Sequence, residues 1–267
     1  MLATSNAQRI VCWFSCGAAS AVATKLAIEA NARGPRLPLV VARCHVAEEH
    51  PDNDRFAADC ERWFGVPILE LANERFGASI YGVFEKERYI VGPAGAPCTR
   101  ALKKRVREGF QQPGDLQVFG YTIEEQHRID NFIDANNDAR LWPVLVEHDL
   151  SHADCLGIVD RAGIRLPDMY RLGYRNNNCI GCVKGGAGYW NKIRVDFPEA
   201  FTRMAALERK IGASICKENG QRVYLDELSP TAGSYEAEPS VQCGIFCELA
   251  DAAIGASQAA EGERNHG

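Results

Sequence analysis

The segment Ile-Val-Cys-Trp-Phe-Ser-Cys-Gly-Ala-Ala-Ser, residues 10–20, decides how this chain folds. The apolar residues at its start predict a short buried strand, and the Ala-rich stretch from Ala18 to Ala30 predicts a helix. Gly17 stands at the turn between the two. A strand that passes through such a turn into a helix leaves main-chain N–H groups free, and the helix dipole adds to their attraction for an anion. The segment therefore predicts a phosphate or sulfate site, although small residues here would also suit a plain strand–helix turn.

Strands and helices alternate along most of the remaining chain. Helices are predicted at residues 52–63, 79–87, 99–110 and 123–136, and from a cap at Asp149 or Ser151 to about Ala162. Further strands are predicted at residues 37–44, 66–71 and 116–121, and residues 141–146 are predicted to be a strand or an extended segment. Such alternation predicts an α/β fold with a doubly wound, mostly parallel sheet covered by helices on both faces.

The composition changes in the last third of the chain. Residues 173–188 are rich in Gly, Asn and Cys and predict a structured loop, residues 189–211 are helical with a break near Pro198, and residues 222–225 predict a last strand. We therefore expect three parts. They are a nucleotide-binding domain at residues 8–175, a Cys- and Gly-rich loop with a C-terminal helical cap at residues 176–250, and a disordered tail at residues 251–267.

Composition and charge argue against several classes of protein. The chain has 267 residues, 46% of them hydrophobic and 24% charged, which suits one large globular domain or two small ones. Its net charge of −5 argues against sequence-blind nucleic-acid binding, which needs basic surface, so a nucleic-acid partner stays an open question. No secretory signal is recognisable, and no apolar run reaches the roughly 20 residues of a membrane span. We expect a cytoplasmic protein without a membrane partner, in which cysteines serve as metal ligands or catalytic thiols more readily than as disulfides.

Polar residues follow the predicted strands, where ligands gather in such sheets. After the second strand, Glu49 and Asp52 are candidates to accept hydrogen bonds from ribose hydroxyls or an adenine amino group, although Asp52 could instead cap the next helix. On the basic helix at residues 99–110, Arg100 and Lys103 are candidates to hold phosphate or sulfate oxygens, unless that helix face is merely solvated.

The end of the fourth predicted strand and the segment that follows it hold Gly120, Glu124 and Arg128. A guanidinium grips an oxyanion through two parallel N–H groups, so Arg128 is the strongest single candidate for an anion-binding side chain. The alternative is a surface Arg that pairs with Glu124 or Glu125. His127 is expected at the surface.

Two cysteines, Cys179 and Cys182, form a Cys-x-x-Cys pair on a predicted loop. Thiolates at this spacing suit an iron–sulfur cluster or zinc, and the alternative is a pair of buried, inert thiols. The glycines within residues 183–192 open the next helix and could form a second anion nest. Core positions are expected for Cys12, Cys44, Cys60, Cys155 and Cys216.

Taken in order, these segments resemble the sulfonucleotide reductases, the phosphoadenylyl-sulfate and adenylyl-sulfate reductases of the PP-loop superfamily. The loop from Ser15 to Ser20 looks like the PP-loop Ser-Gly-Gly-x-Asp-Ser, with Cys16 in place of the first Gly and Ala19 in place of the Asp. The reductases relax the same positions and do not split the α–β phosphate bond. The departure therefore favours the reductase-like branch over the ATP-cleaving one.

The resemblance implies an adenine nucleotide alpha hydrolase-like fold that binds phosphoadenylyl sulfate, adenylyl sulfate or ATP. Cys243 stands in a segment similar to the family's C-terminal Glu-Cys-Gly-Leu-His and would be a catalytic residue together with Arg128, although Gln242 and Phe246 replace the Glu and the His. The residues implied for nucleotide binding are Ser15, Cys16, Gly17, Ala18, Ala19, Ser20, Glu49, Asp52, Arg100, Lys103, Gly120, Glu124 and Arg128.

The resemblance also implies a 4Fe–4S cluster, with zinc as the less favoured metal. Its ligands would be Cys98, Cys179 and Cys182, because Pro97 stands where the family has another Cys. The fourth iron would be open or would take Cys243, Cys247 or a non-Cys ligand. Electrons would come from a thioredoxin-like donor. Three functions remain open: a reductase-like or sulfur-transfer enzyme, an ATP-dependent PP-loop enzyme that adenylates and thiolates a nucleic acid or small molecule, and a catalytically silent nucleotide-binding protein.

Overall fold

The chain divides into two compact units. The computed structural model describes residues 7–92, 95–136, 139–239 and 241. The sheet unit comprises Met1–His45, His50–Ala72 and Val106–Asn177, and the C-terminal unit comprises Val46–Glu49, Asn73–Arg105 and Asn178–Gly267. The segment 73–105 thus belongs with the C-terminal part of the chain, and the predicted tail at residues 251–267 lies outside the described residues. Within the described residues, no helix is both long and apolar enough to cross a membrane.

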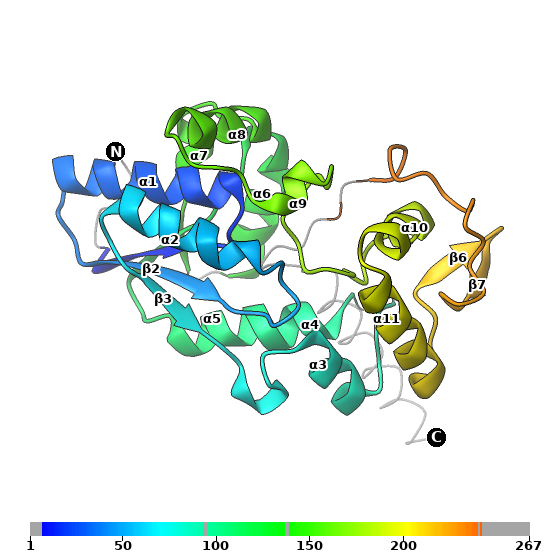
Figure 1. Cartoon of the computed structure of the whole chain (residues 1–267). Coiled ribbons are helices and arrows are strands. Elements are labelled where there is room, and N and C mark those ends of the chain that lie inside the picture. The colour runs from blue at the N-terminus through cyan, green and yellow to red at the C-terminus, as the bar shows by residue number, and fades with distance from the viewer. Residues whose placement is uncertain (1–6, 93–94, 137–138, 240, 242–267) are drawn as a thin grey trace, which may run out of the picture. The chain divides into compact units, whose positions relative to one another are not determined.

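A five-stranded sheet forms the centre of the sheet unit (Figure 1). All of its neighbouring strands run parallel, in the order β3-β2-β1-β4-β5. The parallel α/β sheet predicted from the sequence is confirmed. The strands are β1 (Arg9–Trp13), β2 (Leu39–Cys44), β3 (Ile68–Leu71), β4 (Asp115–Val118) and β5 (Arg140–Trp142).

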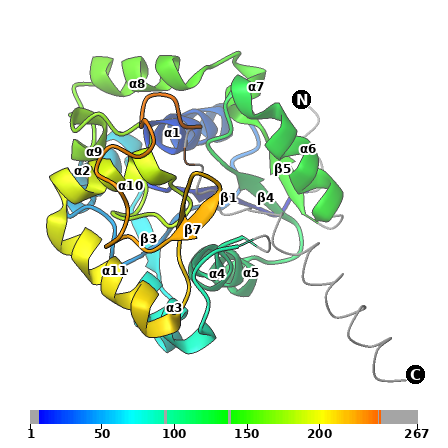
Figure 2. The same cartoon turned by 90° about the vertical axis from the view of Figure 1, so that its right-hand side faces the viewer.

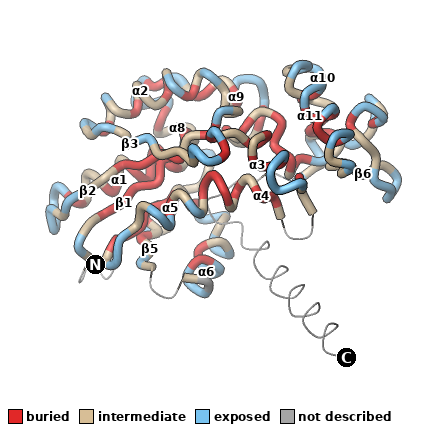
Figure 3. The backbone as a smooth tube through the Cα atoms, turned by 90° about the horizontal axis from the view of Figure 1, so that it is seen from below, coloured by how far each residue is buried: buried red, intermediate tan, exposed pale blue. Residues whose placement is uncertain are grey.

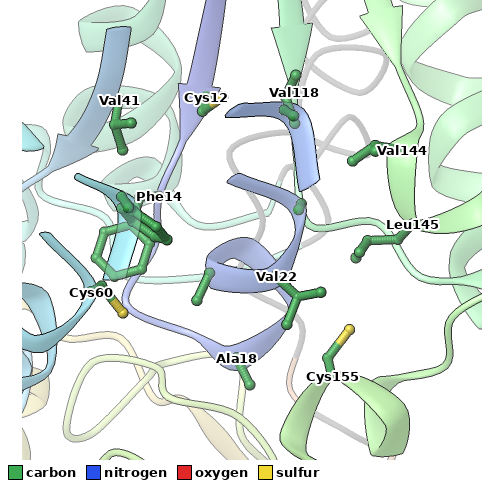
Figure 4. Packing of buried hydrophobic residues seen from close by; sticks show 14 of the residues in the cluster. Cys12, Phe14, Ala18, Val22, Val41, Cys60, Val118, Val144, Leu145 and Cys155 are labelled. Atoms are coloured by element: carbon green, nitrogen blue, oxygen red, sulfur yellow. The ribbon is translucent and has the colours of Figure 1, made fainter. Parts of the chain in front are cut away.

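One face of the sheet is covered by helices through a buried apolar cluster (Figure 4). Strand alternation sends Ile10, Cys12 and Phe14 into this cluster, where Ala18 and Val22 of the first helix meet them. Figure 3 shows β1 and the start of that helix as buried chain. The helices on this face are α1 (Ala18–Arg33), α2 (Asp52–Phe64), α7 (Val144–Glu147) and α8 (His152–Arg161).

Aromatic side chains fill the opposite face. Trp13 stacks on Phe119 with ring centroids 6.5 Å apart, and it meets the edge of Phe110 at 6.0 Å. Phe119 also contacts Phe132 at 5.7 Å. Phe110 ends α5 (Arg105–Phe110) and Phe132 belongs to α6 (Gln126–Ala135). Helices therefore lie on both faces, which is consistent with a doubly wound fold (Figure 2).

The strand order reverses between β1 and β4. From β1 the sheet continues through β2 to β3 on one side, and through β4 to β5 on the other. In open α/β sheets, ligands bind at the carboxyl ends of the strands where the order reverses in this way. The loops that leave β1 and β4 are thus the natural place for a ligand.

Helices dominate the C-terminal unit. α10 (Ala187–Asp196) and α11 (Pro198–Ile211) are separated at Phe197, which confirms the predicted break near Pro198. The predicted helix at residues 99–110 begins earlier, at Pro97, and contains one π-helical turn. Other elements of this unit are α3 (Ile80–Glu87), α4 (Pro97–Thr99), the π-helical turn η2 (Arg100–Lys104) and a hairpin of β6 (Cys216–Glu218) with β7 (Gln221–Val223).

Candidate anion-binding site

The loop that leaves β1 is held in shape by its own serines. The hydroxyl oxygen of Ser20 accepts the main-chain N–H of Ser15 at 3.0 Å and the Ser15 hydroxyl at 3.1 Å, and Ser20 donates to the Gly17 carbonyl at 2.9 Å. Gly17 is the N-cap of α1 and provides no side-chain cap. A helix that begins without a side-chain cap leaves first-turn N–H groups to other acceptors, and an anion is one of them.

Cys16 adopts a backbone conformation that the surrounding structure must maintain. Its φ of 56° lies in the left-handed region, which costs a non-glycine residue roughly 1–2 kcal/mol. The side-chain nitrogen Nδ2 of Asn177 donates to the Cys16 carbonyl and to Oδ1 of Asn53, both at 2.7 Å. All three residues are buried. Strain of this kind persists where a surrounding network fixes it, and it clusters at functional sites.

Tyr170 completes the loop from a distant part of the sequence. It lies on α9 (Asp168–Arg171), and its phenol oxygen accepts the main-chain N–H of Ala18 at 3.4 Å. A Cβ atom added to Gly17 would lie 3.4 Å from the same oxygen. Burial raises the pKa of Tyr170 to about 12, so the hydroxyl is neutral near pH 7. Sequence reasoning missed Tyr170 and Asn177, because they lie 152 and 161 residues from their partners in the loop.

Gly120 is required by packing. It follows β4, and a Cβ atom there would lie only 2.5 Å from the main-chain nitrogen of Ser20 and 2.7 Å from the carbonyl carbon of Ala19. The loop after β4 therefore rests on the first turn of α1. The structure thus brings together two segments that the sequence predicted for one site, the loop at residues 15–20 and Gly120.

Arg128 lies beside the end of β4 with two partners. Its guanidinium carbon is 4.7 Å from the ring centroid of Tyr121, and its side chain forms an ion pair with Glu125. The ion pair with Glu125 agrees with the alternative expected for a surface arginine. The side chain is only 15% exposed, however, so it does not lie free on the surface. His127 is exposed, as predicted. The cation–π contact with Tyr121 and the ion pair with Glu125 hold the guanidinium in place, which favours recognition of an oxyanion.

Two carboxylates of the sheet unit that were predicted to bind a nucleotide, Glu124 and Asp52, accept hydrogen bonds from other protein groups. Glu124 accepts the main-chain N–H of His152 at 3.2 Å, at the start of α8. Asp52 accepts hydrogen bonds from Arg55 and Arg165 and, at 3.0 Å, from the Asp168 amide. Burial alone would raise the pKa of Asp52, but the hydrogen bonds from Arg55 and Asp168, with the nearby Arg165 charge, lower it overall. Asp52 therefore ties α2 to the segment that carries α9.

The remaining predicted nucleotide residues belong to the C-terminal unit. Arg100 pairs with Glu87 at 3.9 Å, Lys103 is buried within η2, and Glu49 is half-buried in a turn. The neighbouring Glu48 caps α3, accepting from the Ser79 hydroxyl at 2.5 Å and the Ile80 amide at 2.9 Å. A role for the predicted residues in nucleotide binding stays a prediction.

The Cys-x-x-Cys pair sits on a loop fixed by Tyr189. The phenol oxygen of Tyr189 accepts the Cys182 main-chain N–H at 2.9 Å, and its hydroxyl donates to the Cys179 carbonyl at 3.4 Å. Between the cysteines, Gly181 has a φ of 72°, and a Cβ atom there would lie 3.0 Å from the Trp190 ring. Both cysteines are buried.

The second predicted anion nest already holds an anion from the chain itself. The carboxylate of Glu238 accepts the main-chain N–H groups of Gly188 at 2.6 Å and Tyr189 at 3.0 Å. These groups belong to the first turn of α10, whose N-cap is Gly186. A helix start with free N–H groups attracts a carboxylate. The segment therefore binds an anion as expected, but the anion is the Glu238 side chain, which caps α10.

Of the predicted metal ligands, Cys98, Cys179 and Cys182 belong to the C-terminal unit. Cys98 lies half-buried on α4, while Cys243 and Cys247 lie outside the described residues. Within residues 7–92, 95–136, 139–239 and 241, no group of three or more His, Cys, Asp and Glu side chains is arranged to hold a metal ion. The described residues alone do not supply the ligand set of a 4Fe–4S cluster, and the metal centre stays a prediction.

The cysteines expected in the core are buried, which confirms their assignment. Burial raises the pKa of Cys155 and Cys216 to about 12, and it raises the pKa of Cys12 and Cys60 further. A thiol in this state is neutral near pH 7 and is a poor nucleophile.

Comparison with known proteins shows sequence similarity over part of the chain. A scan against models of known protein families finds no match. The chain is similar to the acyl-CoA ligase sidI of Beauveria bassiana (strain ARSEF 2860), with 32% identity over 134 residues, or 50% of this chain. Those residues make up 22% of the fungal protein, so the chain spans about a fifth of that relative's length.

Proposed function

We propose that this chain binds the anionic part of an adenine nucleotide at the loop of residues 15–20 and acts as a sulfonucleotide reductase-like or sulfur-transfer enzyme. The observation that carries the proposal is the start of α1, which has no side-chain cap and follows β1 at the point where the strand order reverses. A helix N-terminus attracts phosphate and sulfate, and ligands of this kind of sheet bind at this point.

Two further features support an anionic ligand. Arg128 carries a positive charge beside the end of β4, and its cation–π contact with Tyr121 helps to hold the guanidinium in place. Cys16 is held in a left-handed conformation by a buried amide. The adenine nucleotide, as opposed to free phosphate, rests on the resemblance of the ordered segments to the sulfonucleotide reductases.

An ATP-dependent PP-loop enzyme and a catalytically silent binder are the alternatives. Ala19 stands where the ATP-cleaving branch has an Asp, which favours the other two readings. The expected catalytic thiol, Cys243, lies outside the described residues.

Calorimetric titration with adenylyl sulfate, phosphoadenylyl sulfate and ATP separates these functions. A sulfated nucleotide is expected to bind with a Kd below about 1 mM, roughly −4 kcal/mol, and more tightly than ATP. With a dithiol present, sulfite release is then measured. The dithiol becomes a disulfide, its two electrons reduce the sulfate sulfur, and AMP or its 3′-phosphate leaves. Preferential binding of ATP would favour the ATP-dependent enzyme, binding without sulfite release the silent binder, and no binding would reject all three.

A further inference from the structure

The loop after β1 is met by two side chains that no sequence motif predicted. Tyr170 and Asn177 follow the last strand of the sheet unit, and both contact residues 16–18. Apart from these contacts, the two side chains keep one hydrogen-bond donor and one acceptor for which the described residues provide no partner.

The donor is the phenol proton of Tyr170. Its oxygen accepts the main-chain N–H of Ala18 at 3.4 Å, and the main-chain N–H of Asn177 lies close enough to lower the pKa of the phenol. Within the described part of the chain, no acceptor for the phenol proton is found. Because the pKa is raised to about 12, the proton stays on the oxygen at neutral pH and is available to a ligand.

The acceptor is the side-chain oxygen of Asn177. This residue is 9% exposed, and its Oδ1 is buried without a hydrogen-bond partner among the described residues. The amide orientation is fixed, because the other end faces the carbonyl of Cys16, which can only accept. A buried acceptor left in this state is costly, so a donor is expected to meet it when the site is filled.

We infer that Tyr170 and Asn177 are ligand-binding residues of the loop site, in which the phenol donates to an anionic oxygen and the Asn177 oxygen accepts from a hydroxyl or amino group of the same ligand. The inference rests on the proposed function and narrows its substrate class. Free sulfate would satisfy the phenol and the N-terminus of α1 but has no donor for the Asn177 oxygen. A nucleotide carries both kinds of group, since its ribose hydroxyls and adenine amino group are donors.

The phenol is tested with Tyr170→Phe, and Tyr81→Phe is the matched control. Tyr81 is a buried phenol of the C-terminal unit whose pKa is also raised to about 12. Tyr170→Phe is expected to weaken adenylyl sulfate binding about tenfold or more while leaving adenosine, which has no anion, within about twofold. A purely structural role would weaken both ligands alike, and that result would overturn the assignment of Tyr170.

The Asn177 oxygen is tested from the ligand side, since replacing Asn177 would also break its bond to Cys16. Wild-type protein is titrated with adenylyl sulfate and with its 2′-deoxy, 3′-deoxy and 6-deamino analogues. At least one analogue is expected to bind about tenfold more weakly, because it leaves the buried oxygen without a donor. Equal affinity for all four overturns the role of Asn177 and leaves the proposed function standing. If wild-type protein binds neither adenylyl sulfate nor ATP, the proposed function and this inference fail together.

Discussion

The phenol oxygen of Tyr170 lies 3.4 Å from the main-chain nitrogen of Ala18, the first residue of α1. Tyr170 follows every strand of the sheet unit in the sequence, yet it contacts the loop after the first strand. A ligand anion would share the start of α1 with this phenol. Substitutions around the loop should therefore separate ligand binding from folding.

Gly120→Ala is expected to destabilise the sheet unit by roughly 1–3 kcal/mol, because its Cβ atom would lie 2.5 Å from the Ser20 nitrogen and force backbone to move. Gly109→Ala is the matched control. Gly109 lies within α5 and its Cβ atom would meet nothing within 4 Å, so alanine there should be neutral or stabilising. Chemical denaturation measures both variants. Equal stability of the two would show that the loop after β4 does not press on α1.

Arg128→Lys is expected to raise the Kd for adenylyl sulfate about tenfold, roughly 1.4 kcal/mol, with little change in Tm. Lysine keeps a charge for Glu125 but loses the planar contact with Tyr121 and the bidentate grip on an oxyanion. The exposed Arg161 provides a control, as Arg161→Lys should change neither property. If Arg128→Lys keeps wild-type affinity and wild-type Tm, Arg128 only forms the ion pair with Glu125 and does not bind the ligand.

Glu238→Ala is expected to cost roughly 1–3 kcal/mol, because the N–H groups of Gly188 and Tyr189 lose a charged acceptor at the start of α10. Since Tyr189 also holds the Cys179–Cys182 loop, labelling of these thiols should become faster. Glu227→Ala breaks only an exposed pair with Arg209 and should cost less than about 1 kcal/mol. Similar losses in the two variants would contradict the capping role.

Glu208 should make stability depend on pH. It is buried on α11 and accepts the amides of Ile215 at 2.5 Å and Leu225 at 2.6 Å. Burial raises its pKa to about 7, the negative Asp226 adds to the rise, and the two amides and Arg209 oppose it. The folded chain therefore binds this proton more tightly than the unfolded chain, whose carboxyl has the usual pKa near 4.5.

This stabilising contribution is complete below the unfolded pKa and is lost as the pH rises through about 7. The free energy of unfolding should fall by up to about 3 kcal/mol across that window. Denaturation at a series of pH values measures the slope, which Glu208→Gln should flatten because glutamine does not titrate. An unchanged slope in this variant would assign the pH dependence to other groups.

Local signals in the sequence predicted the sheet well, because most of its strands lie in stretches rich in apolar residues that end at a turn. They failed where tertiary context decides. Residues 141–146 were predicted to be a strand or an extended segment, but the strand stops at Trp142 and Val144 begins α7 after Pro143. Only one strand of the β6–β7 hairpin was predicted, since strands this short show no periodicity. The pair Asn219-Gly220, with φ angles of 50° and 81°, was the available signal for that turn.

The site could be predicted only in part. The loop at residues 15–20 and Gly120 carry local turn signals, and the structure places them against each other. Tyr170, Asn177 and Glu238 carry none, because their roles depend on contacts between segments far apart in the chain. The glycines at the start of α10 correctly predicted an anion nest, yet nothing in the sequence identified Glu238 as the anion.

The most direct test of an anion site at the start of α1 is the affinity of Gly17→Asp for adenylyl sulfate. Gly17 has a φ of −99°, which any residue adopts, and a Cβ atom there would meet only ordinary contacts at 3.4 and 3.7 Å. An aspartate at this N-cap should preserve or raise Tm while its charge competes with the ligand, and Gly17→Asn should cap α1 without that charge. Gly17→Asp is expected to bind adenylyl sulfate at least about tenfold more weakly than wild type, with a smaller loss for Gly17→Asn. Wild-type affinity in a folded Gly17→Asp protein would contradict an anion site at the start of α1.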